Sequence, residues 1–155
     1  MVTTMDSVEP LHVDAVLSDL CKLLHRLAGP HVDLVVEYED DLPAVRFDQG
    51  VLRRVVVDLV RNASDVLADE GRIAVRAAAA AGRVVLTVAD TGPGVSVEGL
   101  PGIFEPFHAQ RVGASGAETG LAAVHEVVVA NGADIRVAST PGGGAKFSIY
   151  LPVWA

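Results

Sequence analysis

The sequence predicts an α+β fold, a two-layer sandwich in which three helices cover one face of a mixed sheet. Three segments carry apolar residues at helical spacing, and five shorter segments that contain apolar, β-branched or aromatic residues lie between and after them. The order along the chain is helix, strand, helix, two strands, a long glycine-rich loop, helix and two strands. Strands that come in pairs, without regular alternation with helices, are typical of this class.

The first helix is predicted from Leu11 to Ala28 and the third from Leu121 to Ala130. Gly29-Pro30 ends the first and Asn131-Gly132 ends the third, because these residues do not continue a helix. The second helix begins after Asp48, whose side chain can cap it, and it has one apolar face. Its apolar residues are Leu52, Val55, Val56, Leu59, Val60, Ala63, Val66 and Leu67.

Five strands are predicted from apolar and β-branched runs that are bounded by turn residues. They span His31 to Glu37, Ile73 to Ala79, Arg83 to Ala89, Asp134 to Ser139 and Ala145 to Leu151. Ala81-Gly82 joins the second and third strands as a hairpin, and Gly71 ends the second helix. Residues 1–10 are expected to be an irregular lead-in, so that one domain covers residues 11–155.

Composition restricts the classes of function. The chain has 155 residues, of which 50% are hydrophobic, as expected for a folded domain with one core. The formal net charge of -8 argues against general binding of nucleic acids or anionic membranes, which requires a basic surface. The single cysteine, Cys21, cannot form an internal disulfide. No stretch is apolar enough to span a bilayer and no secretory signal is evident, so a cytoplasmic location is expected.

Asn62 is the most informative residue of the second helix. At about 100° per residue it falls at the edge of the apolar face, so a half-buried carboxamide is expected there. Asp58 and Asp65 lie on the same side of the helix. A carboxamide oxygen suits a hard cation such as Mg²⁺, and Asp58 is close enough to join the outer shell of the metal or to orient a water molecule. The polar border of an ordinary amphipathic helix would give the same pattern.

The segment Asp90-Thr91-Gly92-Pro93-Gly94 directly follows a predicted strand. A carboxylate at a strand end can accept a hydrogen bond from the exocyclic amine of a purine. Nearby glycines let the backbone approach a flat ring without clashes from Cβ atoms. The alternative is a common Asp-Gly turn with no ligand.

The loop that follows is rich in glycine and proline, and a loop of this length inside a domain is usually functional or disordered. Gly116 and Gly120 precede the third helix, whose N-terminus offers N–H groups to phosphate, and Arg111 can add a charge-assisted contact. A flexible surface loop is the alternative. Phe104 and Phe107 need a surface to pack on, which predicts a lid anchor or a small cluster on the core.

Taken together and in order, these segments resemble the catalytic ATP-binding domain of bacterial two-component sensor histidine kinases, in the gyrase, Hsp90, histidine kinase and MutL superfamily. The resemblance covers about Leu11 to Pro152. Each motif alone is weak to moderate, but four in this order and spacing are strong. They are the N box Asp58-Leu59-Val60-Arg61-Asn62-Ala63, the DxGxG box at Asp90 to Gly94, the F box Phe104-Glu105-Pro106-Phe107 and the strand entry Gly142-Gly143-Gly144-Ala145-Lys146-Phe147.

The resemblance implies the Bergerat ATP-binding fold, with ATP and Mg²⁺ as cofactors. It implies that Asn62 binds Mg²⁺ with Asp58 as its catalytic neighbour, and that Asp90 recognises adenine. Further nucleotide contacts are expected from Asp65, Gly92, Gly94, Phe104, Phe107, Arg111, Gly116, Gly120, Leu121 and Ala145. The implied partners are a histidine-containing dimerisation domain, in the same or a separate chain, and a response regulator. No nucleic acid and no direct membrane contact are expected.

Several positions depart from the family pattern. The second glycine box, usually GTGLGL, reads Gly116-Ala117-Glu118-Thr119-Gly120-Leu121, and a carboxylate at Glu118 would repel the β- and γ-phosphates. Ala145 replaces a common Thr. Asp58 stands where most histidine kinases have Asn and where ATP hydrolases of the superfamily have Glu as a general base. The five histidines show neither the HExxxP nor the HDxxN pattern of a phosphoacceptor.

Three functions therefore compete. The first is the ATP-binding part of a histidine kinase that donates the γ-phosphoryl group to a histidine on a partner domain. The second is a degenerate regulatory module that binds nucleotide weakly or not at all, which Glu118 and Thr119 favour. The third is an anti-sigma-type serine kinase, which Asp58 favours. An unrelated protein with chance motifs remains a further alternative.

Overall fold

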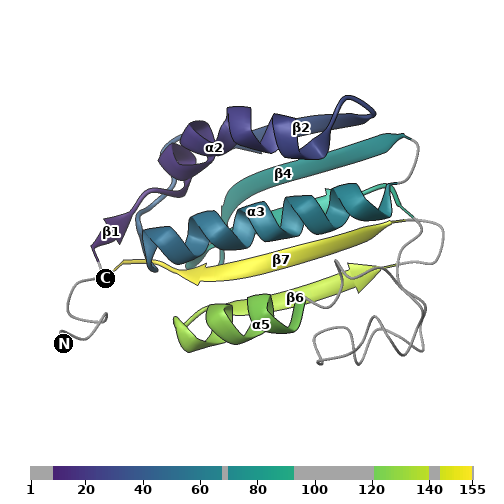
Figure 1. The fold of residues 1–155 in the computed structure, drawn as a ribbon. Helices are drawn as coiled ribbons and strands as arrows, with labels where there is room; N and C mark the ends of the chain where they lie inside the picture. Colours follow the sequence, from purple (N-terminus) through teal and green to yellow (C-terminus); the bar gives the residue numbers. More distant parts are fainter. Residues whose placement is uncertain (1–8, 68–69, 93–120, 140–143, 155) are drawn as a thin grey trace.

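The computed structural model describes residues 9–67, 70–92, 121–139 and 144–154. The described residues form two layers, with helices packed on one face of a sheet (Figure 1). This confirms the predicted α+β two-layer sandwich. In these parts of the chain, no helix combines the length and the apolarity needed to cross a lipid bilayer.

The main sheet is mixed and has the order β2-β4-β5-β7-β6 in the described residues. β2 and β4 are parallel, while the other neighbouring pairs are antiparallel. The parallel pair requires a crossover, which α3 provides on the helical face. The strands are β2 (Val32–Tyr38), β4 (Gly71–Ala80), β5 (Arg83–Asp90), β6 (Asp134–Ser139) and β7 (Ala145–Pro152).

Three helices are described, and all lie on the same face of the sheet: α2 (Val13–Ala28), α3 (Gln49–Val66) and α5 (Leu121–Ala130). The helix α3 lies between the other two and contacts both (Figure 1). Its predicted N-cap is confirmed, because the backbone N–H of Val51 donates to Oδ1 of Asp48 at 2.9 Å. The central position of α3 places its C-terminal turn beside the ends of several strands.

Side-chain alternation along β5 directs one face of this strand into the core. Val84, Leu86 and Val88 are at most 1% exposed. Asp90 is the next residue with the same orientation and the last residue of the strand. The carboxylate therefore enters the same layer as the apolar side chains that precede it.

The structure differs from the sequence prediction at the start of the first helix and at the end of the second. Leu11 pairs with Val45 in a two-stranded sheet of β1 (Pro10–Leu11) and β3 (Val45–Arg46), so the first helix begins two residues later than predicted. Gly71 begins β4 and does not end the second helix, which finishes at Val66. Two-residue strands carry too little periodicity to be detected from sequence.

Candidate functional site

The candidate site lies at the end of the sandwich where α3 and β5 finish and β7 begins (Figure 1). A Cβ atom placed on Gly92 would lie 3.3 Å from Cγ2 of Val66 and 3.4 Å from Cδ2 of Leu67. The Asp90 turn therefore packs directly against the C-terminal end of α3. The sequence predicts that both segments line one nucleotide site, and the structure shows that they pack against each other through Gly92, Val66 and Leu67.

Asp90 is a buried carboxylate at the centre of this turn. It is 9% exposed, and its Oδ1 accepts a hydrogen bond from the backbone N–H of Gly92 at 2.8 Å. Burial raises the pKa of Asp90, while backbone hydrogen bonds from Gly92 and Ala145 act in the opposite direction. A carboxylate has about four acceptor positions, so these two donors leave capacity for a further donor.

A second pair of hydrogen bonds closes the turn on its other side. The backbone N–H of Thr91 donates to the carbonyl of Arg72 at 3.1 Å, and the backbone N–H of Arg72 donates to Oγ1 of Thr91 at 2.9 Å. These bonds extend the β4–β5 ladder one residue beyond Asp90. The carboxylate is thus held at the end of a paired strand and not on a free loop.

Gly144, the residue before β7, supports the same turn, a role that the sequence does not predict. Its φ angle is 88°, and a Cβ atom there would lie 2.0 Å from the carbonyl oxygen of Asp90. Only glycine allows this approach of two backbones. Ala145, a predicted contact residue, follows as the first residue of β7 and is half-buried. The glycine run before this strand is the signal that points to the close approach.

Asn62 lies on α3 and is 7% exposed, so it is more deeply buried than the half-buried position that its helical angle predicts. The reason is that α3 has a helix on each side, which widens the buried part of its surface. Within the described part of the chain, its buried Oδ1 accepts no hydrogen bond. Such an unpaired buried oxygen is costly, and a hydrogen-bond donor or a cation placed beside it would remove this cost.

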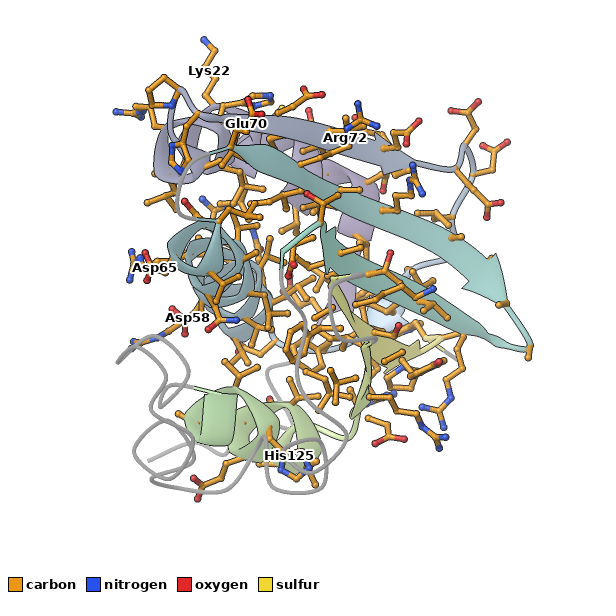
Figure 2. All side chains as sticks on the ribbon, turned by 90° about the vertical axis from the view of Figure 1, so that its right-hand side faces the viewer. Lys22, Asp58, Asp65, Glu70, Arg72 and His125 are labelled. Atoms are coloured by element: carbon orange, nitrogen blue, oxygen red, sulfur yellow. The ribbon has the colours of Figure 1, made fainter. Side chains whose placement is uncertain are left out.

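The two acidic residues that flank Asn62 on α3 are less buried. Figure 2 shows Asp58 and Asp65 on the same side of the helix, with Asp58 toward α5. Oδ2 of Asp58 lies 3.8 Å from Nε of Arg54, and Asp65 is exposed. Asp58 also lines a groove of about 210 Å³ between α3 and α5. The carboxylate of Asp58 therefore faces the space between two helices, whereas that of Asp65 faces solvent.

The remaining predicted contacts fall outside the described residues or on their border. Outside the described residues lie Gly94, Phe104, Phe107, Arg111, Gly116 and Gly120, together with Glu118 and Thr119. Leu121 begins α5, and its side chain is also outside the description. The adenine and metal halves of the expected site can thus be compared with the structure, and the phosphate half cannot.

Sequence comparison places the chain in a known family. The model of the family described as "Histidine kinase-, DNA gyrase B-, and HSP90-like ATPase" matches residues 47–155. The sensor kinase CckA of Brucella abortus is 35% identical over 159 residues, which covers 93% of this chain and 17% of that protein. The sensor histidine kinase ZraS of Escherichia coli K12 is 32% identical over 157 residues, covering 96% of this chain and 33% of that protein. The chain thus spans a third or less of the length of these two relatives.

Solved structures lead to the same family. Full-length ShkA in complex with AMPPNP superposes with a TM-score of 0.82 at 29% identity, covering 96% of this chain and 32% of that chain. The mycobacterial sensor histidine kinase MprB gives a TM-score of 0.77 at 25% identity, covering 94% of this chain and 97% of that chain. The resemblance inferred from the four motifs is confirmed. This chain belongs to the family of histidine kinase-, DNA gyrase B- and HSP90-like ATPases.

Proposed function

We propose that this chain is the Mg-ATP-binding catalytic domain of a sensor histidine kinase. In this role it would donate the γ-phosphoryl group of ATP to a histidine on a dimerisation domain, in the same or a separate chain. The observation that carries the proposal is the unpaired, buried Oδ1 of Asn62 on the helix whose end packs against the Asp90 turn. A response regulator would then receive the phosphoryl group from that histidine.

Asp90 would recognise adenine. Its carboxylate is held by backbone N–H groups of Gly92 and Ala145 and keeps acceptor capacity for the exocyclic amine of the base. An amine that donates to a buried carboxylate forms a strong, charge-assisted hydrogen bond. Gly92 and Gly94 would allow the base to lie close to the backbone, as their lack of Cβ atoms permits.

Asn62 would hold Mg²⁺ through Oδ1. Mg²⁺ prefers oxygen ligands and is commonly bound by one or two protein groups together with substrate phosphates and water. No group of three His, Cys, Asp or Glu side chains is placed to bind a metal in the described ranges. A cation at Asn62 would therefore depend on the nucleotide, and when bound it would offset the charge of the phosphates.

The transfer step would rely mainly on positioning. The P–O bond between the β- and γ-phosphates breaks, ADP leaves, and the imidazole nitrogen of the acceptor histidine forms the new P–N bond. A neutral histidine is itself the nucleophile, so no strong base is required of Asp58. Arg111, Gly116, Gly120 and Leu121 would contact the phosphates, and Phe104 and Phe107 would anchor the lid.

Nucleotide titration tests the proposal. The parent protein is expected to bind ATP more tightly with Mg²⁺ than without it. Asn62→Ala should remove most of this Mg²⁺ dependence. Asp90→Asn should lower the affinity for ATP and leave its Mg²⁺ dependence unchanged. A parent protein that binds no ATP under either condition contradicts the proposal.

A degenerate regulatory module is the second candidate, and Glu118 and Thr119 in the second glycine box favour it. Glu118→Gly should raise ATP affinity if the carboxylate repels the phosphates, because glycine restores the family pattern. Transfer from labelled ATP to an isolated histidine domain separates a kinase from a module that only binds. Transfer to a serine on a protein substrate would favour the anti-sigma-type kinase that Asp58 suggests.

A further inference from the structure

Two side-chain hydrogen bonds join the end of α2 and the turn that follows it to the C-terminal end of α3. Nε2 of His31 lies 3.1 Å from the carbonyl oxygen of Leu67, and Oγ of Ser64 donates to the carbonyl of Ala28 at 3.0 Å. Because a carbonyl oxygen only accepts, Nε2 of His31 carries the hydrogen. The two bonds connect the same pair of segments, so α2 and the end of α3 are held at a fixed separation.

Gly29 sets the position of the His31 ring. Its φ angle is 88°, and a Cβ atom on it would lie 3.0 Å from Cε1 and Nδ1 of His31. The backbone N–H of Val32 donates to the carbonyl of Gly29 at 3.2 Å, which closes the turn. The ring therefore packs over a residue without a side chain, and this orientation directs Nε2 to α3.

Leu67 transmits this contact to the candidate site. It is 3% exposed, and its Cδ2 lies 3.4 Å from the Cβ position of Gly92, the residue whose N–H donates to Asp90. His31 and Thr91 line the same open groove, together with Glu70 and Arg72, which Figure 2 labels at that end of the sheet. A contiguous series of contacts thus runs from His31 through Leu67 and Gly92 to the carboxylate of Asp90.

We propose that His31 and Ser64 are positioning residues that hold the end of α3 against the Asp90 turn and so set the geometry of adenine recognition. This inference rests on the proposed nucleotide function. Neither residue belongs to the motifs that carry the family resemblance. His31 acts through Leu67, whose side chain lies beside Gly92, and Ser64 holds the same end of α3 through its bond to Ala28. The affinity for adenine should therefore depend on them more strongly than the affinity for the phosphates does.

A pair of substitutions at His31 tests the hydrogen bond itself. The side-chain N–H of Gln can reach the position of Nε2, whereas the amide of Asn is one bond too short. His31→Asn and Ser64→Ala are each expected to lower ATP affinity about three- to tenfold, the usual effect of losing one hydrogen bond. His31→Gln should restore parent affinity. His12→Ala is the control, because His12 makes no side-chain cap bond at the other end of α2.

Selectivity for the base distinguishes a positioning role of His31 from a general loss of structure in the His31→Asn variant. Inosine triphosphate has the same phosphates as ATP but lacks the exocyclic amine that Asp90 would bind. His31→Asn should lower affinity for ATP several-fold and for inosine triphosphate by less than twofold. Equal losses for the two nucleotides, or an ATP affinity unchanged from the parent, would overturn the inference.

The backbone amide resonance of Gly92 gives a test that needs no nucleotide. Its chemical shift should change in His31→Asn and Ser64→Ala, while the other resonances show that both variants are folded. In His31→Gln the chemical shift should equal that of the parent protein. If the parent protein binds no ATP, the proposed function is wrong. The Gly92 resonance would still test whether His31 and Ser64 position the end of α3 against the Asp90 turn. A Gly92 resonance that stays in place in both variants would refute the positioning role.

Discussion

At the scale of single residues, Asp90 combines a cost to stability with a proposed role in recognition. Its pKa is raised above the ordinary value of 3.8, chiefly because burial disfavours the charged form. The folded state thus binds the proton more tightly than the unfolded state does. Stability is gained where the carboxyl is protonated and is lost as the pH rises through the raised pKa.

Asp90→Asn removes this titration and keeps an acceptor for the N–H of Gly92. The free energy of unfolding of the variant should exceed that of the parent at neutral pH, and the difference should shrink as the pH falls toward 3.8. Urea unfolding between pH 3 and pH 8 measures it. A difference that is constant across this range would show that the desolvation of Asp90 is not responsible. The same variant should bind ATP weakly, which is the usual conflict between stability and function.

A similar conflict between stability and function is expected at Asn62, because an unpaired buried oxygen lowers the free energy of unfolding by about 1–3 kcal/mol. Asn62→Leu has nearly the same shape and removes the polar atom, so the nucleotide-free protein should gain about 1 kcal/mol while the Mg²⁺ dependence of ATP binding disappears. Asn131→Leu is the control for a carboxamide that is hydrogen-bonded and less buried, since Nδ2 of Asn131 donates to the carbonyl of Val127 at 2.8 Å. A gain in the control as large as that at Asn62 would attribute the effect to hydrophobicity alone.

At the scale of elements, the helices and the five main strands could be predicted from sequence because each has a clear period or a clear turn at its ends. α5 and β6 have the predicted bounds, Leu121–Ala130 and Asp134–Ser139. The order of the strands could not be predicted, because pairing between β2 and β4 depends on a crossover that no local pattern encodes. The sequence predicted Asn62 and Asp90 as two halves of one nucleotide site, but for the same reason it could not predict how the end of α3 packs against the Asp90 turn.

The approach of β7 to β5 at Gly144 can be tested by substitution with alanine. A Cβ atom there would overlap the carbonyl of Asp90, whereas Gly132 has a similar φ of 85° and no atom within 4 Å of its Cβ position. Gly132→Ala should cost about 1 kcal/mol through its backbone conformation alone. Gly144→Ala should cost at least about 2 kcal/mol more, as large losses accompany steric overlap in a packed site.

Thermal or denaturant unfolding of the two alanine variants measures this difference. If the two variants are equally destabilised, the contact between Gly144 and the Asp90 carbonyl contributes nothing beyond the φ angle. If Gly144→Ala folds and keeps its stability, the carbonyl of Asp90 must move. The position of the carboxylate would then be less constrained than its hydrogen bonds indicate.

At the scale of the whole molecule, one end of the sandwich contributes to stability and the other end carries the candidate site. One end holds the start and the end of the described chain together: β1 pairs with β3, Val45 bridges Val153, and the guanidinium of Arg46 lies 4.4 Å from the ring centroid of Trp154. The other end carries Asn62, Asp90 and Gly144. Substitutions that loosen the first end should therefore change stability without changing base selectivity.

The proposed site also makes the stability of the whole domain depend on ligand. A nucleotide that binds only the folded state adds about 2.7 kcal/mol of unfolding free energy when its concentration is 100 times its Kd. Mg-ATP should therefore raise the Tm of the parent protein, and the rise should increase with ATP concentration at fixed Mg²⁺. Asn62→Leu should show a rise in Tm that no longer depends on Mg²⁺, and Asp90→Asn should require more ATP for the same rise.

Differential scanning calorimetry of the three proteins at matched concentrations checks these expected differences in Tm. A Tm of the parent that does not respond to ATP would remove the thermodynamic basis of the nucleotide site, whereas an equal response in all three proteins would place the nucleotide elsewhere on the domain.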